Sequence, residues 1–351
     1  MKGVSPETVP DVRIDLLSDT LTRPTAAMRS AMGAAEVGDD VFSEDPTTLE
    51  LEARIAAMLG KEAALFMPSG TMSNLIGLLV HCGPGDEFIC EANCHIFNYE
   101  QAGYAQVGGI GVQPICGENG ILNVDQLRDQ VRGENVHLAR TRLVCLEQTH
   151  NRAAGRVLPY DGVAEICTWA REQGLACHLD GARLFNAVVA SGISADKWAQ
   201  HFDTVSVCFS KGLGAPVGSA LCGPLDKIKQ ARRRRKMLGG GMRQIGILTA
   251  AALYALEHHI ERLAEDHAKA QILADAIRAS KHLELISDQV DTNIVIFTVA
   301  KELGTAAEFC DYLRTQGIRM NPNAPQKVRA VTHLDVTKEQ CAEVADVLRK
   351  C

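Results

Sequence analysis

Short apolar runs alternate with stretches of helical spacing over the first two thirds of the chain. The runs are of strand length and predict strands over residues 64–67, 87–90, 111–115, 143–147, 175–180, 204–209 and 219–222. Between several of them, apolar residues recur with the period of an amphipathic helix, over residues 71–82, 124–131 and 161–173. Strands that alternate with helices predict an α/β fold with a mostly parallel, seven-stranded sheet and helices on both faces.

The pattern changes after Arg243. Residues 244–279 contain no Pro and hold Gly246 as their only Gly, which predicts one or two long helices. Further elements are expected as a strand at 294–299, a helix at 306–316, a strand near 330–333 and a helix after Thr337. A chain of 351 residues suggests two domains. The predicted divisions are an N-terminal segment over 1–34, a large domain over 35–255 and a smaller α+β domain over 256–351.

Charge and composition narrow the class of partner. The net charge of −7 and the aromatic fraction of 5% do not favour nucleic acid or an anionic membrane, which select basic surfaces and stacking rings. The N-terminus lacks the apolar stretch of a secretory signal. The longest charge-free stretch, between Glu62 and Asp86, contains prolines and polar residues that do not suit a membrane helix. We therefore expect a cytoplasmic protein.

Three local features are best interpreted without a special function. The twelve cysteines form no C-x-x-C pair, so we expect most of them to be small buried hydrophobes in a reducing compartment. The five consecutive cations from Arg232 to Lys236 predict a solvated or subunit-facing helix segment. His258 and His259 are expected to be surface or packing residues.

Several common catalytic motifs are missing from the sequence. It contains no G-x-G-x-x-G, no P-loop, no H-E-x-x-H and no G-x-S-x-G. Dinucleotide-dependent dehydrogenases, P-loop NTPases, zinc proteases and α/β-hydrolases therefore lose their main support.

Two segments place polar groups where a strand ends. In PSGTMSN, the residues Ser69, Gly70 and Thr71 open a helix and could bind a phosphate through backbone N–H groups, or form an ordinary N-cap. In CHLDGAR, an apolar strand ends at Asp180, whose carboxylate could pair with a pyridinium nitrogen or cap the next helix.

Two further segments place cations beside glycines. In FSKGLG, Lys211 follows an apolar strand, and a desolvated lysine can form a Schiff base with an aldehyde, although most lysines are simply exposed. In LGGGMRQ, a glycine-rich turn brings Arg243 to a helix start, either as a phosphate contact or as part of a structural turn. The order of phosphate loop, Asp180 and Lys211 is more specific than any one segment.

The chain resembles the L-threonine aldolase family, which are pyridoxal-phosphate (PLP) enzymes of fold type I. The similarity runs from about Ile14 to the C-terminus and rests on the segments DLLSDTLTRPT, VGDDVFSEDPT, HLDGARLFNAVVA, SKGLGAPVGS, KMLGGGMRQ and VTHLDV. It implies a lyase of amino-acid metabolism that cleaves L-threonine or L-allo-threonine to glycine and acetaldehyde. It also implies a homotetramer with active sites at dimer interfaces, an N-terminal segment that contributes to the site, and no metal.

The resemblance implies roles for residues that match the family's motifs. Lys211 resembles the Schiff-base lysine, Asp180 the partner of the pyridine nitrogen, and His95 the histidine that stacks on the cofactor ring. The implied cofactor-binding residues are Ser69, Gly70, Thr71, His95, Asp180, Arg183, Lys211 and Arg243. The implied substrate-binding residues are Ser18, His95, His137, Arg183 and Arg329. His95 and His137 are also candidate general bases, with a bound water as the alternative, and Glu100 has no assigned role.

Two departures from the family and two alternatives accompany this interpretation. Phe42 stands where the family often has Tyr, and Gln148 where Asn is common. The nearest alternative is another reaction of fold type I, such as β-elimination, alanine racemisation or serine hydroxymethyl transfer. A non-catalytic, cofactor-binding regulatory domain is the second alternative. Such a domain would tolerate loss of Lys211 or Asp180, and both are present.

Overall fold

The computed structural model describes residues 11–133 and 135–351, whose contacts form two compact units. The larger unit covers residues 22–264, and the smaller unit joins the described N-terminal residues before 22 to everything after 264.

These limits differ from the predicted domain divisions. The predicted limit at residue 255 falls inside helix α11 (Gly246–His258). Of the predicted segment 1–34, residues 1–10 lie outside the described residues. The part after residue 21 belongs to the larger unit, where α1 (Ala26–Gly33) packs against α11.

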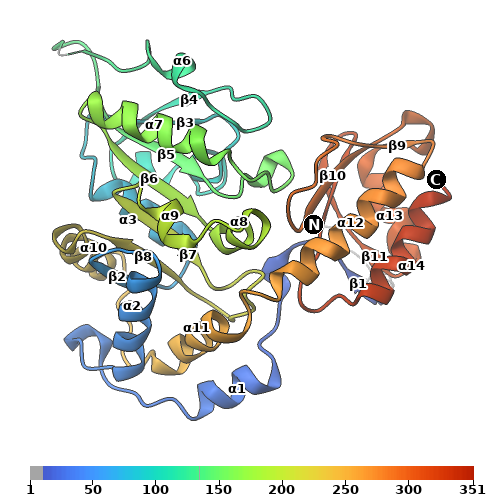
Figure 1. Ribbon diagram of the computed structural model, residues 1–351, viewed down its shortest axis with the longest axis horizontal. Helices are drawn as coiled ribbons and strands as arrows, with labels where there is room; N and C mark the ends of the chain where they lie inside the picture. The colour runs from blue at the N-terminus through green and yellow to red at the C-terminus, as the bar shows by residue number, and fades with distance from the viewer. Residues whose placement is uncertain (1–10, 134) are drawn as a thin grey trace, which may run out of the picture. The chain divides into compact units, whose positions relative to one another are not determined.

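A seven-stranded sheet forms the centre of the larger unit (Figure 1). Its strands are β2 (Ala63–Met67), β3 (Asp86–Glu91), β4 (Gly111–Ile115), β5 (Arg140–Glu147), β6 (Ala176–Gly181), β7 (Thr204–Cys208) and β8 (Ser219–Gly223). They lie in the order β2-β8-β7-β6-β5-β3-β4. β8 runs antiparallel to both β2 and β7, and the other neighbouring strands of this sheet pair in parallel. The predicted α/β class with a mostly parallel sheet is confirmed.

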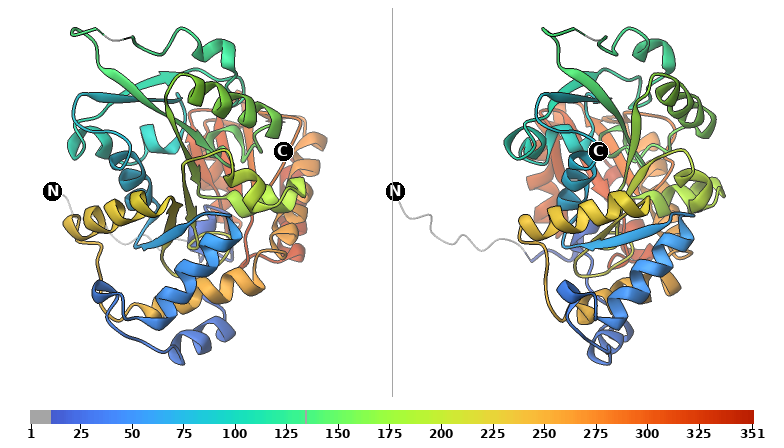
Figure 2. Two further views of the ribbon diagram at one scale, coloured as in Figure 1. Left: turned by 60° about the vertical axis from the view of Figure 1, so that its left-hand side comes forward. Right: turned by 90° about the vertical axis from the view of Figure 1, so that its left-hand side faces the viewer.

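Helices cover both faces of this sheet, as Figure 1 and Figure 2 show. The helices of the larger unit are α1, α2 (Pro46–Met58), α3 (Gly70–Leu79), α4 (His95–Asn98), α5 (Gly103–Gln106), α6 (Val124–Leu127), α7 (Tyr160–Glu172), α8 (Leu184–Ser191), α9 (Ala195–Ala199), α10 (Leu225–Met237) and α11, and its 3₁₀ turns are η2 (Asp40–Phe42) and η3 (Asn151–Ala153). Leu65 and Leu221 pack with α3 and α10, whereas Phe66 and Val205 belong to the cluster of α7, α8 and α9. Because β2, β7 and β8 are buried along almost their whole length, their sequences are nearly continuous apolar runs.

The smaller unit is α+β, as predicted. Its elements are β1 (Ile14–Asp15), η1 (Asp19–Leu21), α12 (Leu263–Ala279), β9 (Leu283–Leu285), β10 (Ile294–Val299), η4 (Lys301–Leu303), α13 (Ala306–Thr315), β11 (Ile318–Arg319), β12 (Asn321–Ala324), β13 (Lys327–Val331) and α14 (Lys338–Arg349). An antiparallel sheet has the order β12-β13-β10-β9, and β1 pairs with β11 in parallel. Leu273, Phe297, Leu313 and Val344 lie in its core.

The cysteines are free thiols, and all but Cys116 and Cys351 are buried. Their predicted role as small packing residues is confirmed. Among the described residues, no helix is long and apolar enough to cross a membrane.

The basic run on α10 is only partly solvated, which corrects the sequence interpretation. Arg235 is 2% exposed and shares the inner face of α10 with Ile228 and Ala231. It donates to Asp40 Oδ2 at 2.6 Å and to the carbonyl of Phe66 at 2.8 Å. Arg235 therefore joins α10 to the edge strand β2 and to the turn η2.

Replacing Arg235 by methionine is expected to lower the free energy of unfolding by about 3 kcal/mol, because it leaves the buried Asp40 carboxylate without its closest cation. Arg232, whose Nη1 lies 3.6 Å from Asp40 Oδ1, should limit the loss. The measurement is urea unfolding, with Arg234→Met on the exposed face of α10 as the matched control. Equal midpoints for the two variants would contradict the role of the buried pair.

Candidate active site

Four candidate segments of the larger unit gather at one edge of the sheet, where its parallel strands end. β2 leads to Gly70, β3 to His95, β6 to Asp180 and β7 to Lys211. The carboxyl ends of parallel strands form the usual ligand crevice of such sheets. In register, Asp180 lies between Glu147 of β5 and Ser206 of β7.

Helix α3 opens this edge with free backbone donors. Ser69 is its N-cap, and the Ser69 hydroxyl accepts from the backbone N–H of Met72 at 3.2 Å. A Cβ on Gly70 would lie 2.7 Å from Cys208 Sγ, so only glycine fits between the helix start and β7. The first N–H groups of a helix lack intrahelical partners, and the dipole is positive there. Gly70 and Thr71 therefore offer a site for a phosphate.

Asp180 is buried at the end of β6 and is held by Asn74 of α3. Asp180 Oδ2 accepts from Asn74 Nδ2 at 3.0 Å, and Oδ1 accepts from the backbone N–H of Ala182 at 3.1 Å. A Cβ on Gly181 would lie 2.6 Å from the carbonyl oxygen of Ser206. This glycine allows β6 to continue close beside β7 after the aspartate.

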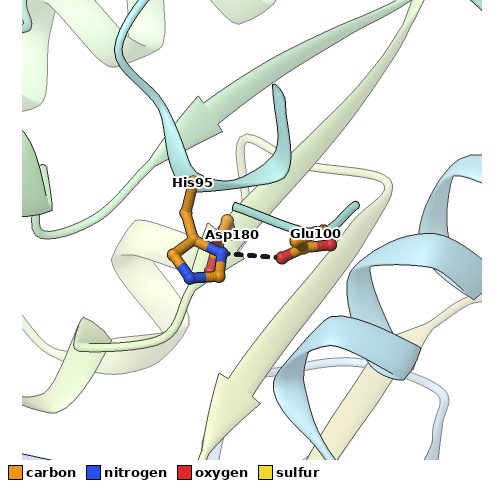
Figure 3. A group of neighbouring side chains, drawn as sticks. All are labelled: His95, Glu100 and Asp180. Carbon is orange, nitrogen blue, oxygen red and sulfur yellow. Dashed lines mark hydrogen bonds and ion pairs between the residues drawn. The ribbon is translucent and has the colours of Figure 1, made fainter. Parts of the chain in front are cut away.

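His95 and Glu100 form a hydrogen-bonded pair beside Asp180 (Figure 3). His95 Nδ1 lies 2.9 Å from Glu100 Oε1, and the backbone N–H of His95 donates to Glu147 Oε2 at 2.5 Å. Burial lowers the pKa of His95, but the hydrogen bond to Glu100 and the charge of Asp180 outweigh it and leave the pKa raised. Burial raises the pKa of Glu100.

These three residues could be mistaken for a metal centre. His95, Glu100 and Asp180 offer ligand atoms within 4.8 Å of one another. However, Asn74 Nδ2 donates to both carboxylates, at 2.9 Å to Glu100 and 3.0 Å to Asp180. A cation would have to displace this amide. The prediction of a metal-free site stays a prediction, and the geometry describes a hydrogen-bonded cluster.

A chain of neutral hydrogen-bonding groups continues from Asn74. Asn74 Oδ1 lies 3.3 Å from His178 Nε2, while His178 Nδ1 and His81 Nε2 each lie 2.9 Å from Thr204 Oγ1. Burial lowers the pKa of His178 to about 4 and that of His81 to about 3. Both imidazoles are therefore neutral at pH 7.

The free energy of unfolding is expected to fall as the pH drops from about 6.5 to about 4. In this range His178 and His81 bind protons in the unfolded chain but stay neutral in the folded protein, so acid favours unfolding. His178→Gln should make this slope shallower by up to one proton, or about 1.4 kcal/mol per pH unit. Urea unfolding at several pH values measures the slope. The matched control for the substitution itself is His258→Gln, because His258 is an exposed histidine. An unchanged slope in His178→Gln would contradict the prediction.

The turn that carries Lys211 is held by its backbone. Thr22 Oγ1 donates to the carbonyl of Lys211 at 2.8 Å, Arg262 Nη1 to that of Gly212 at 3.2 Å, and His259 Nδ1 to that of Leu213 at 2.7 Å. Among the described residues, the Lys211 amine itself has no hydrogen-bond or ion-pair partner. The turn is thus fixed while its amine stays available for chemistry.

Two arginines of the larger unit, Arg183 and Arg243, are also candidate site residues, and they lie in different surroundings. Arg183 is buried and forms the N-cap position of α8 directly after the Asp180 strand. Arg243 is half exposed, donates to Asp39 Oδ2 at 2.8 Å, and lies 5.8 Å from the centre of the Phe42 ring. Their roles toward cofactor and substrate stay predictions.

His137 lies away from the other candidates of the larger unit. It is an exposed residue in the turn before β5, at the amino end of that strand. Asp180 pairs with the last residue of β5. The eight residues of β5 span about 26 Å, so one subunit does not bring His137 and Asp180 together.

Ser18 and Arg329 belong to the smaller unit, where the segments DLLSDT and VTHLDV lie side by side. The backbone N–H of Val331 donates to the carbonyl of Leu16 at 2.8 Å, and His333 Nε2 lies 2.8 Å from the carbonyl of Asp15. Their binding of a substrate carboxylate stays a prediction.

Sequence reasoning missed the residues that support this site. It gave no role to Asn74, Glu100, Thr22 or Arg262, and it treated His259 as a surface or packing residue. Asn74 could have been found, because it lies one helical turn after Gly70 and is a polar residue on an apolar helix. The other contacts join segments far apart in sequence and leave no local signal. Gln148, which replaces a common Asn, is buried and accepts from the backbone N–H of Leu158 at 3.0 Å.

Comparisons with known proteins agree with the geometry. The sequence pattern of the family described as "Beta-eliminating lyase" matches residues 15–302. The chain is 47% identical over 335 residues to low specificity L-threonine aldolase of Escherichia coli (strain K12), covering 95% of this chain and 97% of that protein. It is 43% identical over 329 residues to low-specificity L-threonine aldolase 1 of Arabidopsis thaliana, covering 92% of each.

The fold is also shared with a solved structure. Leishmania major threonine aldolase has a TM-score of 0.83 at 20% identity, covering 96% of this chain and 99% of that chain. The family resemblance and the fold class predicted from the sequence are both confirmed. The chain therefore belongs to the L-threonine aldolases, within the β-eliminating lyase family.

Proposed function

We propose that this protein is a PLP-dependent carbon–carbon lyase that cleaves L-threonine or L-allo-threonine to glycine and acetaldehyde. The observation that carries the proposal is the meeting of three groups at one sheet edge: the helix start at Gly70, the buried carboxylate of Asp180 and the available amine of Lys211. The names of the relatives support the reaction class.

The donor set suits this cofactor. The N-terminus of α3 offers backbone N–H groups to a phosphate, and the tight packing of Gly70 against Cys208 leaves no room for a side chain there. Asp180 would hold the proton of the pyridine nitrogen, and Lys211 Nζ would bind the aldehyde carbon. When bound, PLP supplies an electron sink for the electron pair of a bond broken at Cα.

The residues of this chain would then move protons and fix orientation. A base removes the β-hydroxyl proton of the substrate, the Cα–Cβ bond breaks, and the aldehyde leaves. A proton returned to Cα gives glycine. His95 is the candidate base within the cluster, because its imidazole can take a proton near neutral pH. Arg183 would orient the substrate carboxylate, since a guanidinium pairs with both oxygens.

The family description favours β-elimination as the second candidate. Purified protein should be incubated with L-threonine, L-allo-threonine and L-serine in separate reactions. Acetaldehyde and glycine in equal amounts from the threonines support the proposal. Pyruvate from serine, with no acetaldehyde from either threonine, would replace it by elimination.

A homotetramer and a cytoplasmic location are part of the same proposal. The half-exposed Arg243, with the exposed ring of Phe42 beside it, lies where it could serve a neighbouring subunit. Light scattering after size-exclusion chromatography tests the assembly, and a monomeric active enzyme would refute it.

A further inference from the structure

Asn74 fixes the direction of the hydrogen bonds around the cluster. Its Nδ2 lies 2.9 Å from Glu100 Oε1 and 3.0 Å from Asp180 Oδ2, and carboxylate oxygens accept. The amide therefore directs its two hydrogens to the two acids. Its oxygen then faces His178 Nε2, which donates. Asn74 thus has a matching partner on each side, and the amide has one consistent orientation.

The same oxygen of Glu100 also faces His95. Glu100 Oε1 accepts from Asn74 and lies 2.9 Å from His95 Nδ1, so the arrangement is satisfied when Nδ1 carries a hydrogen and donates it. A neutral imidazole protonated at Nδ1 has a bare Nε2, which is an acceptor. Figure 3 shows this second nitrogen on the side of the ring away from Glu100.

The contact between Glu100 and His95 joins a buried carboxylate to a partly exposed imidazole. The Glu100 side chain is 4% exposed, whereas His95 is 35% exposed and so remains open to a ligand. The other charged groups that act on His95 are Asp180 and Glu147. Glu147 binds the backbone N–H of His95, and Asn74 lies between Asp180 and Glu100, so only Glu100 contacts the ring nitrogens of His95 among the described residues.

We propose that Glu100 is a positioning residue for the reaction: it holds His95 in the form protonated at Nδ1 and so presents the Nε2 lone pair toward the reacting groups. The assignment of the His95 tautomer depends only on the hydrogen-bond geometry of Asn74, Glu100 and His95. Its catalytic consequence rests on the proposed function, in which His95 accepts the substrate's hydroxyl proton.

Three variants separate this role from simple packing. Glu100→Gln can keep an oxygen at the Oε1 position while removing the charge, and should lower kcat about tenfold. Glu100→Ala removes both and should lower kcat about a hundredfold, a fraction of what a general base contributes. His95→Gln combined with Glu100→Gln should be no slower than His95→Gln alone, because Glu100 acts through His95. Glu172→Gln, on the exposed face of α7, is the matched control.

The pH profile gives a readout that packing would not move. Without the charge of Glu100 the protonated imidazole is less stable, so the acid limb of kcat/KM should shift to lower pH by about one unit in Glu100→Gln. An unshifted limb, or losses that add in the double variant, would overturn the catalytic role.

The tautomer itself is measured without substrate. Solid-state NMR of ¹⁵N-histidine-labelled holoenzyme distinguishes a bare Nε2 from a bare Nδ1, and the His95→Gln spectrum identifies the signal. We expect a bare Nε2 in the wild type and a mixture in Glu100→Ala. A bare Nδ1 in the wild type would overturn the proposal. If the tautomer is as expected but no threonine is cleaved, the proposed function fails and the positioning stands.

Discussion

Replacing Lys211 by alanine is expected to lower the cleavage of L-threonine by about 10⁴-fold or more, as loss of an essential nucleophile does. The variant should also lose the visible absorbance that PLP shows when it is bound to a lysine. The fold should survive, because Thr22, Arg262 and His259 hold the turn through backbone carbonyls and not through the lysine side chain.

The matched control is Lys229→Ala, which removes an exposed lysine from α10. It should keep both the absorbance and the activity. Thermal unfolding of the two variants checks that each is folded. Cleavage by Lys211→Ala at the rate of the wild type would refute the assignment of this lysine.

The sequence predicted the central sheet well, because most of its strands are buried and contain an apolar run long enough to be recognised. It predicted the short elements poorly. β1 and β11 have two residues each, and α4, α5 and α6 have one turn each, too few for a period to appear. The helix expected over residues 124–131 ends at Leu127.

Arg235 shows how a local pattern can mislead. Five consecutive cations look solvated as a group, but a helix turns its residues through all directions. Ile228, Ala231 and Arg235 follow helical spacing, so one cation of the run lies on the apolar face and needs a buried acid. The spacing was present in the sequence, whereas its partner Asp40, 195 residues earlier, was not apparent from it.

The site residues also fall into two groups, those that could be placed from the sequence and those that required the fold. Strand ends placed Asp180 and Lys211, since parallel strands bring their carboxyl ends to one edge. The same rule places His137, which precedes its strand, at the opposite edge. Asn74 and Glu100 required the fold, because their contacts with Asp180 and His95 depend on how α3 and the segment after α4 pack against β6.

Replacing Asp180 by asparagine is expected to lower kcat about 10³-fold, because a neutral amide cannot stabilise a protonated pyridine nitrogen as a carboxylate does. The structure predicts a second effect. Asp180 accepts from Asn74 Nδ2 with one oxygen and from the Ala182 N–H with the other, whereas an asparagine has one oxygen. One donor would then face an NH₂ group, at a cost of about 1–3 kcal/mol in stability.

The two effects can be told apart by separate measurements. Titration with PLP gives the fraction of Asp180→Asn that holds cofactor, and kcat at saturation then reports the electronic loss alone. Asp161→Asn, at the exposed start of α7, is the control for charge removal and should keep its activity. Asp180→Glu keeps the charge but lengthens the side chain, so it should retain more activity than Asp180→Asn. If saturated Asp180→Asn turned over like the wild type, the carboxylate would not be the partner of the ring nitrogen.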